Sequence, residues 1–171
     1  STSAGLERVV DLRRSNVERL ADQLDPDPEH ARHTAVLATA IFDRTTDLHG
    51  LTEVEREILW SAAVLHNVGL FISHSSHHKH SYYLIRHSEV FGLTPREVQL
   101  VAHVARYHRR SVPKPSHMDY MSLPREQRVV VSKLAAILRA CDAISRGQVR
   151  NAQSLRLERQ GDELIIVVPG V

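Results

Sequence analysis

Apolar residues recur at every third or fourth position along most of the chain, which is the spacing of amphipathic helices. The pattern predicts six helices, over residues 5–24, 28–47, 53–69, 78–90, 95–108 and 125–145. The third of these is almost wholly apolar after Ile58, so we expect it to be the most buried helix of a bundle. In the last helix, Val129 and Val130 are expected to face the interior.

Capping residues mark where several of these helices begin. Asp27 and Pro28 supply an N-cap and a first-turn proline, and Thr52 and Thr94 each precede a glutamate by three residues, as in a capping box. Residues 111–123 contain prolines and show no periodicity, so they predict an exposed loop.

The end of the chain changes to the composition of strands. Residues 155–159 and 164–168 flank a Gln-Gly-Asp turn and predict a β-hairpin or two strands. The predicted fold class is therefore all-α with a small C-terminal β-hairpin. Residues 1–150 are expected to form the helical domain, and residues 151–171 the start of a small, truncated β appendage.

Length and composition indicate one globular domain, since the 171 residues are 42% apolar and 25% charged. No apolar run approaches the roughly 20 residues that span a membrane, and no secretory signal is visible. The single cysteine, Cys141, lies in an apolar helical pattern, which favours a reducing, cytoplasmic location. Because the chain lacks an initial Met and ends just after a strand, we expect a fragment of a larger protein.

Positive charge and histidine are concentrated in the middle of the chain. The net charge is +2, but the segment from His66 to His117 has seven Lys or Arg and two acids, so it carries +5 and the remainder −3. Eight of the 12 histidines lie within residues 61–108. This distribution indicates an anionic ligand, and a merely solvated basic face is the alternative.

Four residues near the ends of long predicted helices are candidate metal ligands: His30, His66, Asn67 and Asp142. Imidazole nitrogen and carboxylate oxygen together suit Mn, Fe, Zn or Mg. A polar pair that closes a buried helix must also be satisfied by some partner. The alternative is that His66 and Asn67 cap the helix end and form hydrogen bonds with His30 and Asp142.

In order and spacing these four residues resemble the H…HD…D signature of the HD phosphohydrolase superfamily. Several strings resemble, more closely, the C-terminal HD-like domain of exopolyphosphatase / guanosine pentaphosphate phosphatase proteins: DPEHAR at 27–32, LHNVG at 65–69, HHKHSYYLI at 77–85, ARYHRR at 105–110 and LAAILR at 134–139. The resemblance covers about residues 6–146 and implies an HD-domain-like helical bundle.

The resemblance implies a division of labour. In that family, hydrolysis is attributed to N-terminal actin-like ATPase-fold domains, whose glycine-rich loops hold phosphate and whose glutamate acts as base. The C-terminal domain extends the polyphosphate channel and contributes to a homodimer. No catalytic residue can be assigned in this chain, so we do not expect it to hydrolyse polyphosphate or guanosine pentaphosphate alone.

The chain departs from the signature at Asn67, where the superfamily has an aspartate. Loss of that carboxylate removes a charge and a strong ligand, so binding of Mg, Mn or Zn is expected to be weak or absent. The departure from the signature therefore indicates a vestigial or weakly occupied metal site.

A basic set is a candidate for contact with polyphosphate or another phosphate-rich anion, since Arg and Lys suit a chain of phosphates. It is expected to converge on one face and comprises His77, His78, Lys79, His80, Arg86, Arg106, His108, Arg109 and Arg110. Arginines at helix ends could instead balance the helix dipole. Nucleic acid is disfavoured by the near-neutral net charge and the lack of interleaved aromatic residues.

Three functions follow from these patterns. The first is an accessory domain of an exopolyphosphatase-like protein that supplies anion and oligomer contacts. The second is an autonomous metal-dependent phosphohydrolase acting on a nucleotide phosphate, with His30, His66 and Asp142 as ligands and Asn67 as a weak fourth. The third is a purely structural dimerisation module.

Overall fold

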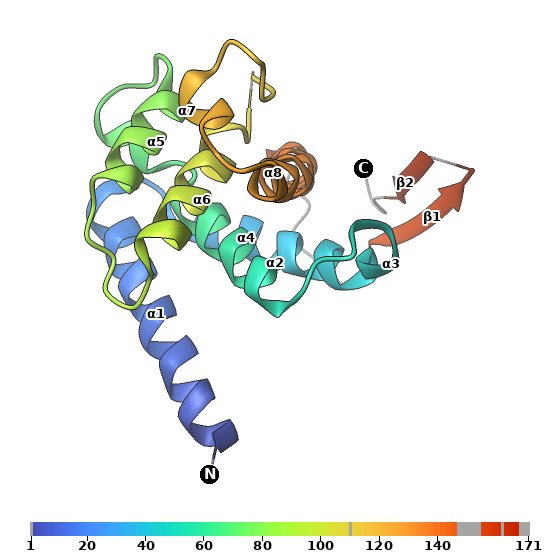
Figure 1. The fold of residues 1–171 in the computed structure, drawn as a ribbon, viewed down its shortest axis with the longest axis horizontal. Coiled ribbons are helices and arrows are strands. Elements are labelled where there is room, and N and C mark those ends of the chain that lie inside the picture. Colours follow the sequence, from blue (N-terminus) through green and yellow to red (C-terminus); the bar gives the residue numbers. More distant parts are fainter. Residues whose placement is uncertain (1, 110, 147–154, 162, 168–171) are drawn as a thin grey trace.

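A computed structural model describes residues 2–109, 111–146, 155–161 and 163–167. The described chain is a bundle of α-helices with a two-stranded hairpin (Figure 1). The helices are α1 (Thr2–Leu24), α2 (Pro28–Arg44), α3 (Thr46–His49), α4 (Glu53–Leu65), the 3-10 helix η1 (Val68–Phe71), α5 (His77–Arg86), α6 (Pro95–Arg106), α7 (Met118–Met121) and α8 (Arg125–Arg146). The strands are β1 (Arg156–Gln160) and β2 (Glu163–Val167). The prediction of an all-α bundle with a C-terminal hairpin is confirmed.

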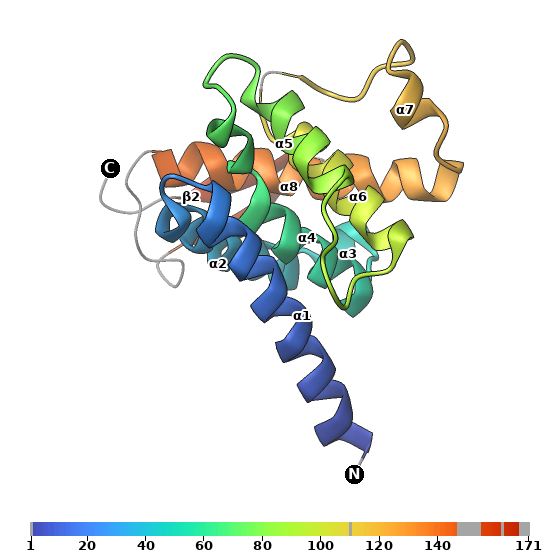
Figure 2. The same ribbon diagram turned by 90° about the vertical axis from the view of Figure 1, so that its left-hand side faces the viewer.

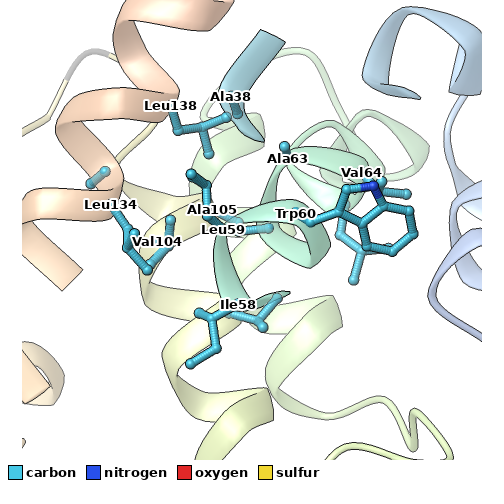
Figure 3. Packing of buried hydrophobic residues seen from close by; sticks show 14 of the residues in the cluster. Ala38, Ile58, Leu59, Trp60, Ala63, Val64, Val104, Ala105, Leu134 and Leu138 are labelled. Carbon is cyan, nitrogen blue, oxygen red and sulfur yellow. The ribbon is translucent and has the colours of Figure 1, made fainter. Parts of the chain in front are cut away.

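Helix α4 is the centre of the bundle, as its apolar sequence predicts. It packs against α1, α2, α6 and α8, and every residue from Ile58 to Leu65 is buried. Figure 3 shows Leu59 on the side of α4 toward Leu134 and Leu138 of α8, and Trp60 and Val64 on the other side. Small residues such as Ala63 let the neighbouring helices approach closely, so the end of α4 is held in a fixed position.

The predicted helix starts carry the expected caps. The Asp27 side chain accepts a hydrogen bond from the backbone N–H of His30 at 3.2 Å. At α6, the Thr94 hydroxyl accepts from the Glu97 N–H at 3.2 Å, and the Glu97 carboxylate accepts from the Thr94 N–H at 2.7 Å. These caps satisfy N–H groups that have no partner within the helix.

Several helix ends differ from the prediction. The helix predicted to reach residue 47 ends at Arg44, because the Thr45 hydroxyl bonds back to the Ile41 carbonyl and a separate turn, α3, follows. The helices predicted to reach residues 69 and 90 end at Leu65 and Arg86. The predicted loop of residues 111–123 contains α7, and Val129, expected inside, is 44% exposed on α8.

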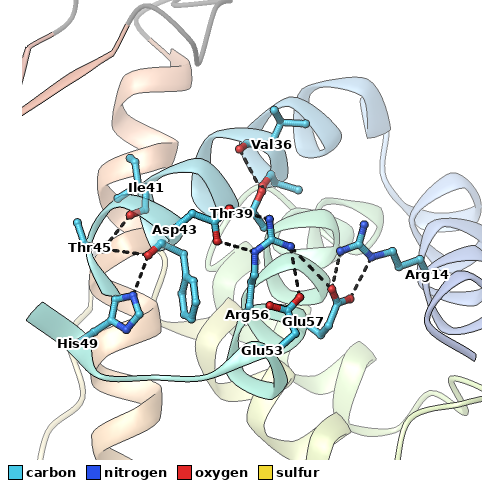
Figure 4. A network of polar contacts seen from close by, with 12 residues as sticks. Arg14, Val36, Thr39, Ile41, Asp43, Thr45, His49, Glu53, Arg56 and Glu57 are labelled. Atoms are coloured by element: carbon cyan, nitrogen blue, oxygen red, sulfur yellow. Dashed lines mark hydrogen bonds and ion pairs between the residues drawn. The ribbon is translucent and has the colours of Figure 1, made fainter. Parts of the chain in front are cut away.

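Ion pairs tie the outer helices to α4 (Figure 4). Arg14 of α1 donates from Nε to Glu57 of α4 at 3.0 Å, and Arg56 of α4 donates from Nε to Asp43 of α2 at 2.8 Å. The contact of Arg14 anchors the second half of α1. Its first half projects from the bundle, with residues 2–9 exposed (Figures 1 and 2).

The hairpin is antiparallel, with Arg156 opposite Val167 and Gln160 opposite Glu163. Arg44 of α2 donates to the Leu155 carbonyl at 2.7 Å and so connects the hairpin to the bundle. Parts of the predicted appendage, at 151–154, 162 and 168–171, lie outside the described residues. Within the described part of the chain, no helix is long and apolar enough to cross a membrane.

Candidate metal and anion site

Three of the four predicted metal ligands come together in space. His30 lies in the first turn of α2, His66 follows the last residue of α4, and Asp142 lies near the end of α8. One potential ligand atom from each residue lies within 4.8 Å of the others. The buried packing of α2, α4 and α8 brings these helix ends together, although the residues are up to 112 positions apart.

His66 is fully buried, and its hydrogen bonding leaves one ring nitrogen without a donor or acceptor. Nδ1 donates to the backbone carbonyl of Ala63, so Nε2 carries the lone pair when the ring is neutral. Nε2 lies 3.5 Å from Asp142 Oδ1 and has no hydrogen-bond partner among the described residues. A backbone carbonyl that fixes Nδ1 is the usual arrangement behind a metal-binding imidazole, so the donor set fits a divalent metal.

Asp142 is buried and ionised. Burial alone would raise the pKa of its carboxyl group, but the close contact and charge interaction with His66, together with His108 and Arg146, lower the pKa to about 2. Arg146, one helical turn later, places Nη2 3.1 Å from Asp142 Oδ2. The carboxylate is therefore available as a metal ligand at neutral pH, and Arg146 supplies the compensating charge.

Asn67 lies at the same site, but it is not one of the three residues whose potential ligand atoms come together. Its side chain is partly buried, lines the pocket described below and does not cap η1. A purely structural role for His66 and Asn67 predicted contacts with His30 and Asp142. The structure has the contact between His66 and Asp142, at 3.5 Å. His30 Nδ1 instead lies 3.4 Å from the hydroxyl of Ser145.

The triad opens into a polar pocket of about 310 Å³, lined by His30, Asn67, Leu70, His74, His77, His108, Arg109, Asp142 and Arg146. His108 repeats the arrangement of His66, because its Nδ1 donates to the carbonyl of Ala105 three residues earlier. Its Nε2 lies 3.2 Å from Nε2 of His77. Burial and the neighbouring His66 hold the pKa of His108 well below its usual range, and burial and Arg109 lower that of His77 to about 4.

Only part of the predicted basic set lines the pocket. His77, His108 and Arg109 line the pocket. Lys79, Arg86 and Arg106 are not among the residues that line it, and Arg106 of α6 instead lies over the ring of Tyr82 on α5. His78 is buried, His80 is partly buried on α5, and Arg110 lies outside the described residues.

Sequence reasoning did not assign His74 and Arg146 to the site. Arg146 could have been found, since it follows Asp142 by four residues and therefore lies on the same face of α8. His74 lies in the connection between η1 and α5, whose path no local pattern predicts.

A family model described as Ppx/GppA phosphatase, domain III, matches residues 12–168. The match covers all of the residues that form the triad and the pocket, and it extends through the hairpin. It agrees with the resemblance noted in the strings around His30, His66 and His108. The chain therefore belongs to the Ppx/GppA phosphatase family, as a domain III of that family.

Proposed function

We propose that this domain binds the phosphate chain on which an exopolyphosphatase-like parent protein acts, with polyphosphate or guanosine pentaphosphate as the ligand. Hydrolysis itself is assigned to actin-like ATPase-fold domains that precede it in the parent. The same resemblance supports a homodimer, and the exposed Leu6, Val9 and Leu12 of α1 offer an apolar contact. Sedimentation of the isolated chain as a monomer at micromolar concentration would contradict the dimer.

The observation that best supports anion binding is that the cations of one region lack carboxylate partners. Several arginines of the first half of the chain have carboxylate partners, such as Arg13 with Glu97 at 2.6 Å and Arg56 with Asp43 at 2.8 Å. The described cations of α5, α6 and the following segment have no ion pair among the described residues, and they are Lys79, Arg86, Arg96, Arg106, Arg109 and Lys114. Unpaired cations gathered in one region are available for a multivalent anion.

The pocket adds directional contacts to this charge. Arg109 and Arg146 lie at the same pocket as several imidazoles, and a guanidinium can donate two hydrogen bonds to one phosphate. Because Asp142 is ionised and paired with Arg146, Arg109 contributes the unbalanced positive charge of this pocket. Arg109 is therefore the residue whose removal should weaken anion binding there.

Arg109→Gln is expected to lower the affinity of the isolated domain for polyphosphate about fivefold and to reduce the salt dependence of binding by about 0.7 in the log–log slope. Titration calorimetry at two salt concentrations measures both. The matched control is Arg19→Gln, which removes an exposed charge from α1 far along the chain. Equal losses in the two variants, or binding that salt does not weaken, would count against the proposal.

A second candidate, a metal-dependent phosphohydrolase, is favoured by the unpartnered Nε2 of His66 beside an ionised Asp142. His30, His66 and Asp142 would hold the metal, with Asn67 as a weak fourth ligand. A divalent ion held there would supply Lewis-acid chemistry toward a phosphate oxygen. Arg109 and His77, which line the same pocket, would orient that phosphate.

Metal binding to the purified domain is expected to be weak, and Asn67→Asp is expected to strengthen it by restoring a carboxylate. Asp142→Asn should weaken it by more than the roughly 10–100-fold that is lost when a residue that only orients a metal ligand is removed. Elemental analysis and competition with a chromogenic chelator measure affinity for Zn and Mn. Asp11→Asn on the exposed face of α1 is the control. If Asn67→Asp binds metal no better than the natural sequence, the triad is not a metal site.

A further inference from the structure

A second cavity lies where the hairpin meets the bundle. Its volume is about 290 Å³, and it is bordered by the end of α2, by α3, by α8 and by β2. Ile41 of α2, Leu48 of α3 and Ile166 of β2 supply aliphatic side chains to its walls. In Figure 1, α3 and the hairpin lie on the opposite side of α8 from α5, which carries His77 of the first pocket. The two cavities share no lining residue.

One face of α8 forms the floor of this cavity. The residues of α8 that line it are Lys133, Ala136, Ile137 and Ala140. Because they are spaced by three, four and seven residues, they lie in one row along the helix. Ala136 and Ala140, one turn apart, leave space that larger side chains would fill. From Lys133 to Ala140 the helix rises about 10 Å, at about 1.5 Å per residue, which is the length of an extended chain of about eight carbons.

The polar side chains of α2 and α3 at this cavity are already satisfied. The Thr45 hydroxyl donates to the Ile41 carbonyl at 2.8 Å. Both ring nitrogens of His49 are used, because Nε2 donates to the Phe42 carbonyl at 2.9 Å and Nδ1 accepts from the Leu51 N–H at 2.9 Å. These two side chains therefore offer a ligand no free donor, and the wall that they form acts as an apolar surface.

Lys133 differs from the other residues that line the cavity. Its Nζ donates to the His49 carbonyl at 2.6 Å, which holds the ammonium group at one end of the row on α8. An ammonium group has three N–H donors, so two remain for a ligand. Within the described part of the chain, no carboxylate forms an ion pair with Lys133. A cation with spare donors at the end of an apolar cavity suits a ligand that has one carboxylate and an aliphatic chain.

We propose that this cavity binds a medium-chain aliphatic monocarboxylate of the length of octanoate. The aliphatic chain lies along Ala136 and Ala140, and the carboxylate accepts hydrogen bonds from Lys133. Since Ile166 of β2 lines the same cavity, the ligand also joins the hairpin to the bundle. A polyphosphate has no apolar surface to cover these walls, so this site is separate in chemistry from the proposed phosphate site.

Titration calorimetry on the whole 171-residue chain tests the ligand class, with hexanoate, octanoate and octylamine as the probes. Octanoate is expected to bind roughly 16-fold more tightly than hexanoate, at about fourfold for each buried methylene. Octylamine has the same chain but is expected to bind at least about tenfold more weakly than octanoate, because its ammonium group would meet that of Lys133.

Two variants test the two ends of the cavity. Lys133→Met keeps an apolar stem and removes the ammonium group, so the affinity for octanoate is expected to fall about tenfold and that for octanol to stay the same. Ala140→Leu fills the space beside Ile166 and is expected to abolish octanoate binding. The controls, Arg8→Met and Ala4→Leu, remove a charge and add an apolar side chain at exposed positions of α1.

The outcomes decide for or against this site. Binding that strengthens from hexanoate to octanoate, weakens in Lys133→Met and is lost in Ala140→Leu supports it. It is overturned if the natural sequence does not bind octanoate at millimolar concentration, or if octylamine binds as tightly or Lys133→Met loses nothing. It is also overturned if Ala140→Leu binds octanoate unchanged. A change in the sedimentation coefficient of Ala140→Leu would show instead that a second copy of the chain covers the cavity.

Discussion

Gly69→Ala is expected to destabilise the domain by about 3 kcal/mol and to lower its melting temperature by about 10 °C. Gly69 lies in η1 against the first turns of α5, where a methyl group would overlap the His77 carbonyl oxygen and the Ser81 backbone nitrogen and would lie 2.7 Å from the Ser81 hydroxyl oxygen. Two of these atoms belong to the backbone, so a rotamer change cannot relieve the overlap and α5 must move.

The same contact makes Gly69 important for the pocket. Its N–H donates to the Ser81 hydroxyl at 2.9 Å, and that hydroxyl donates to the His66 carbonyl at 2.8 Å. Displacement of α5 would break this chain and move His77 away from His108. Thermal unfolding followed by circular dichroism measures the loss, and anion titration measures the effect on the pocket.

Gly5→Ala is the matched control, because a methyl group at Gly5 meets no atom within 4 Å. On the exposed part of α1, alanine should leave stability unchanged or raise it by up to about 1 kcal/mol. A Gly69→Ala protein as stable as Gly5→Ala would show that η1 and α5 do not pack as described.

Between pH 6.5 and pH 4, His103→Leu is expected to lose about 3 kcal/mol less stability than the natural protein loses. His103 is fully buried on α6, beside Tyr82 and Tyr120, and neither ring nitrogen has a hydrogen-bond partner among the described residues. Burial and then the charge of Arg106 lower its pKa from 6.5 to about 4.

The sign follows from proton binding. Between pH 6.5 and pH 4 the unfolded chain binds a proton at His103 and the folded chain does not, so acid favours unfolding. The free energy of unfolding is therefore unaffected by His103 above pH 6.5, and it decreases as the pH falls from 6.5 toward 4. At pH 7, leucine also removes two unpaired nitrogens, and a gain of about 1 kcal/mol is expected.

Urea unfolding at pH 7 and at pH 4 measures this difference. His77 and His108 also destabilise in acid, so the informative quantity is the change between the natural protein and the variant. His87→Gln removes an exposed imidazole and is the control. If His103→Leu loses as much stability on acidification as His87→Gln, the folded protein binds a proton at His103, and the ring has a partner that its surroundings do not indicate.

Features that depend on local sequence were predicted from the sequence. The buried helix α4 follows from the apolar run after Ile58, and the starts of α2 and α6 follow from Asp27 and Thr94, because periodicity and capping act over a few residues. The meeting of His30, His66 and Asp142 was expected from their type, their places at helix ends and a family resemblance. Periodicity alone does not fix how three distant helix ends meet.

The division of the basic residues could not be predicted, because it depends on the angle between α5 and α6. Adjacent positions on α5 diverge, so that His77 faces the pocket, His78 is buried and Lys79 lies outside. The segment carrying Lys114 shows no periodicity, and its position is set by the contact between Tyr107 and His117, 10 residues apart. The exposure of Val129 could not be predicted either, because its place in the apolar pattern of α8 does not decide whether it faces the core or the solvent.

The contrast between paired and unpaired cations gives the molecule an electric dipole moment. Most of the cations on α5, α6 and the segment before α7 lack ion pairs, and most of the ion-paired arginines lie on α1, α2 and α4. A net charge of only +2 produces weak attraction at long range, but a dipole exerts a torque that turns the domain as a polyanion approaches. Encounters would then occur with the unpaired side leading, and the association rate would fall steeply as salt shortens the Debye length.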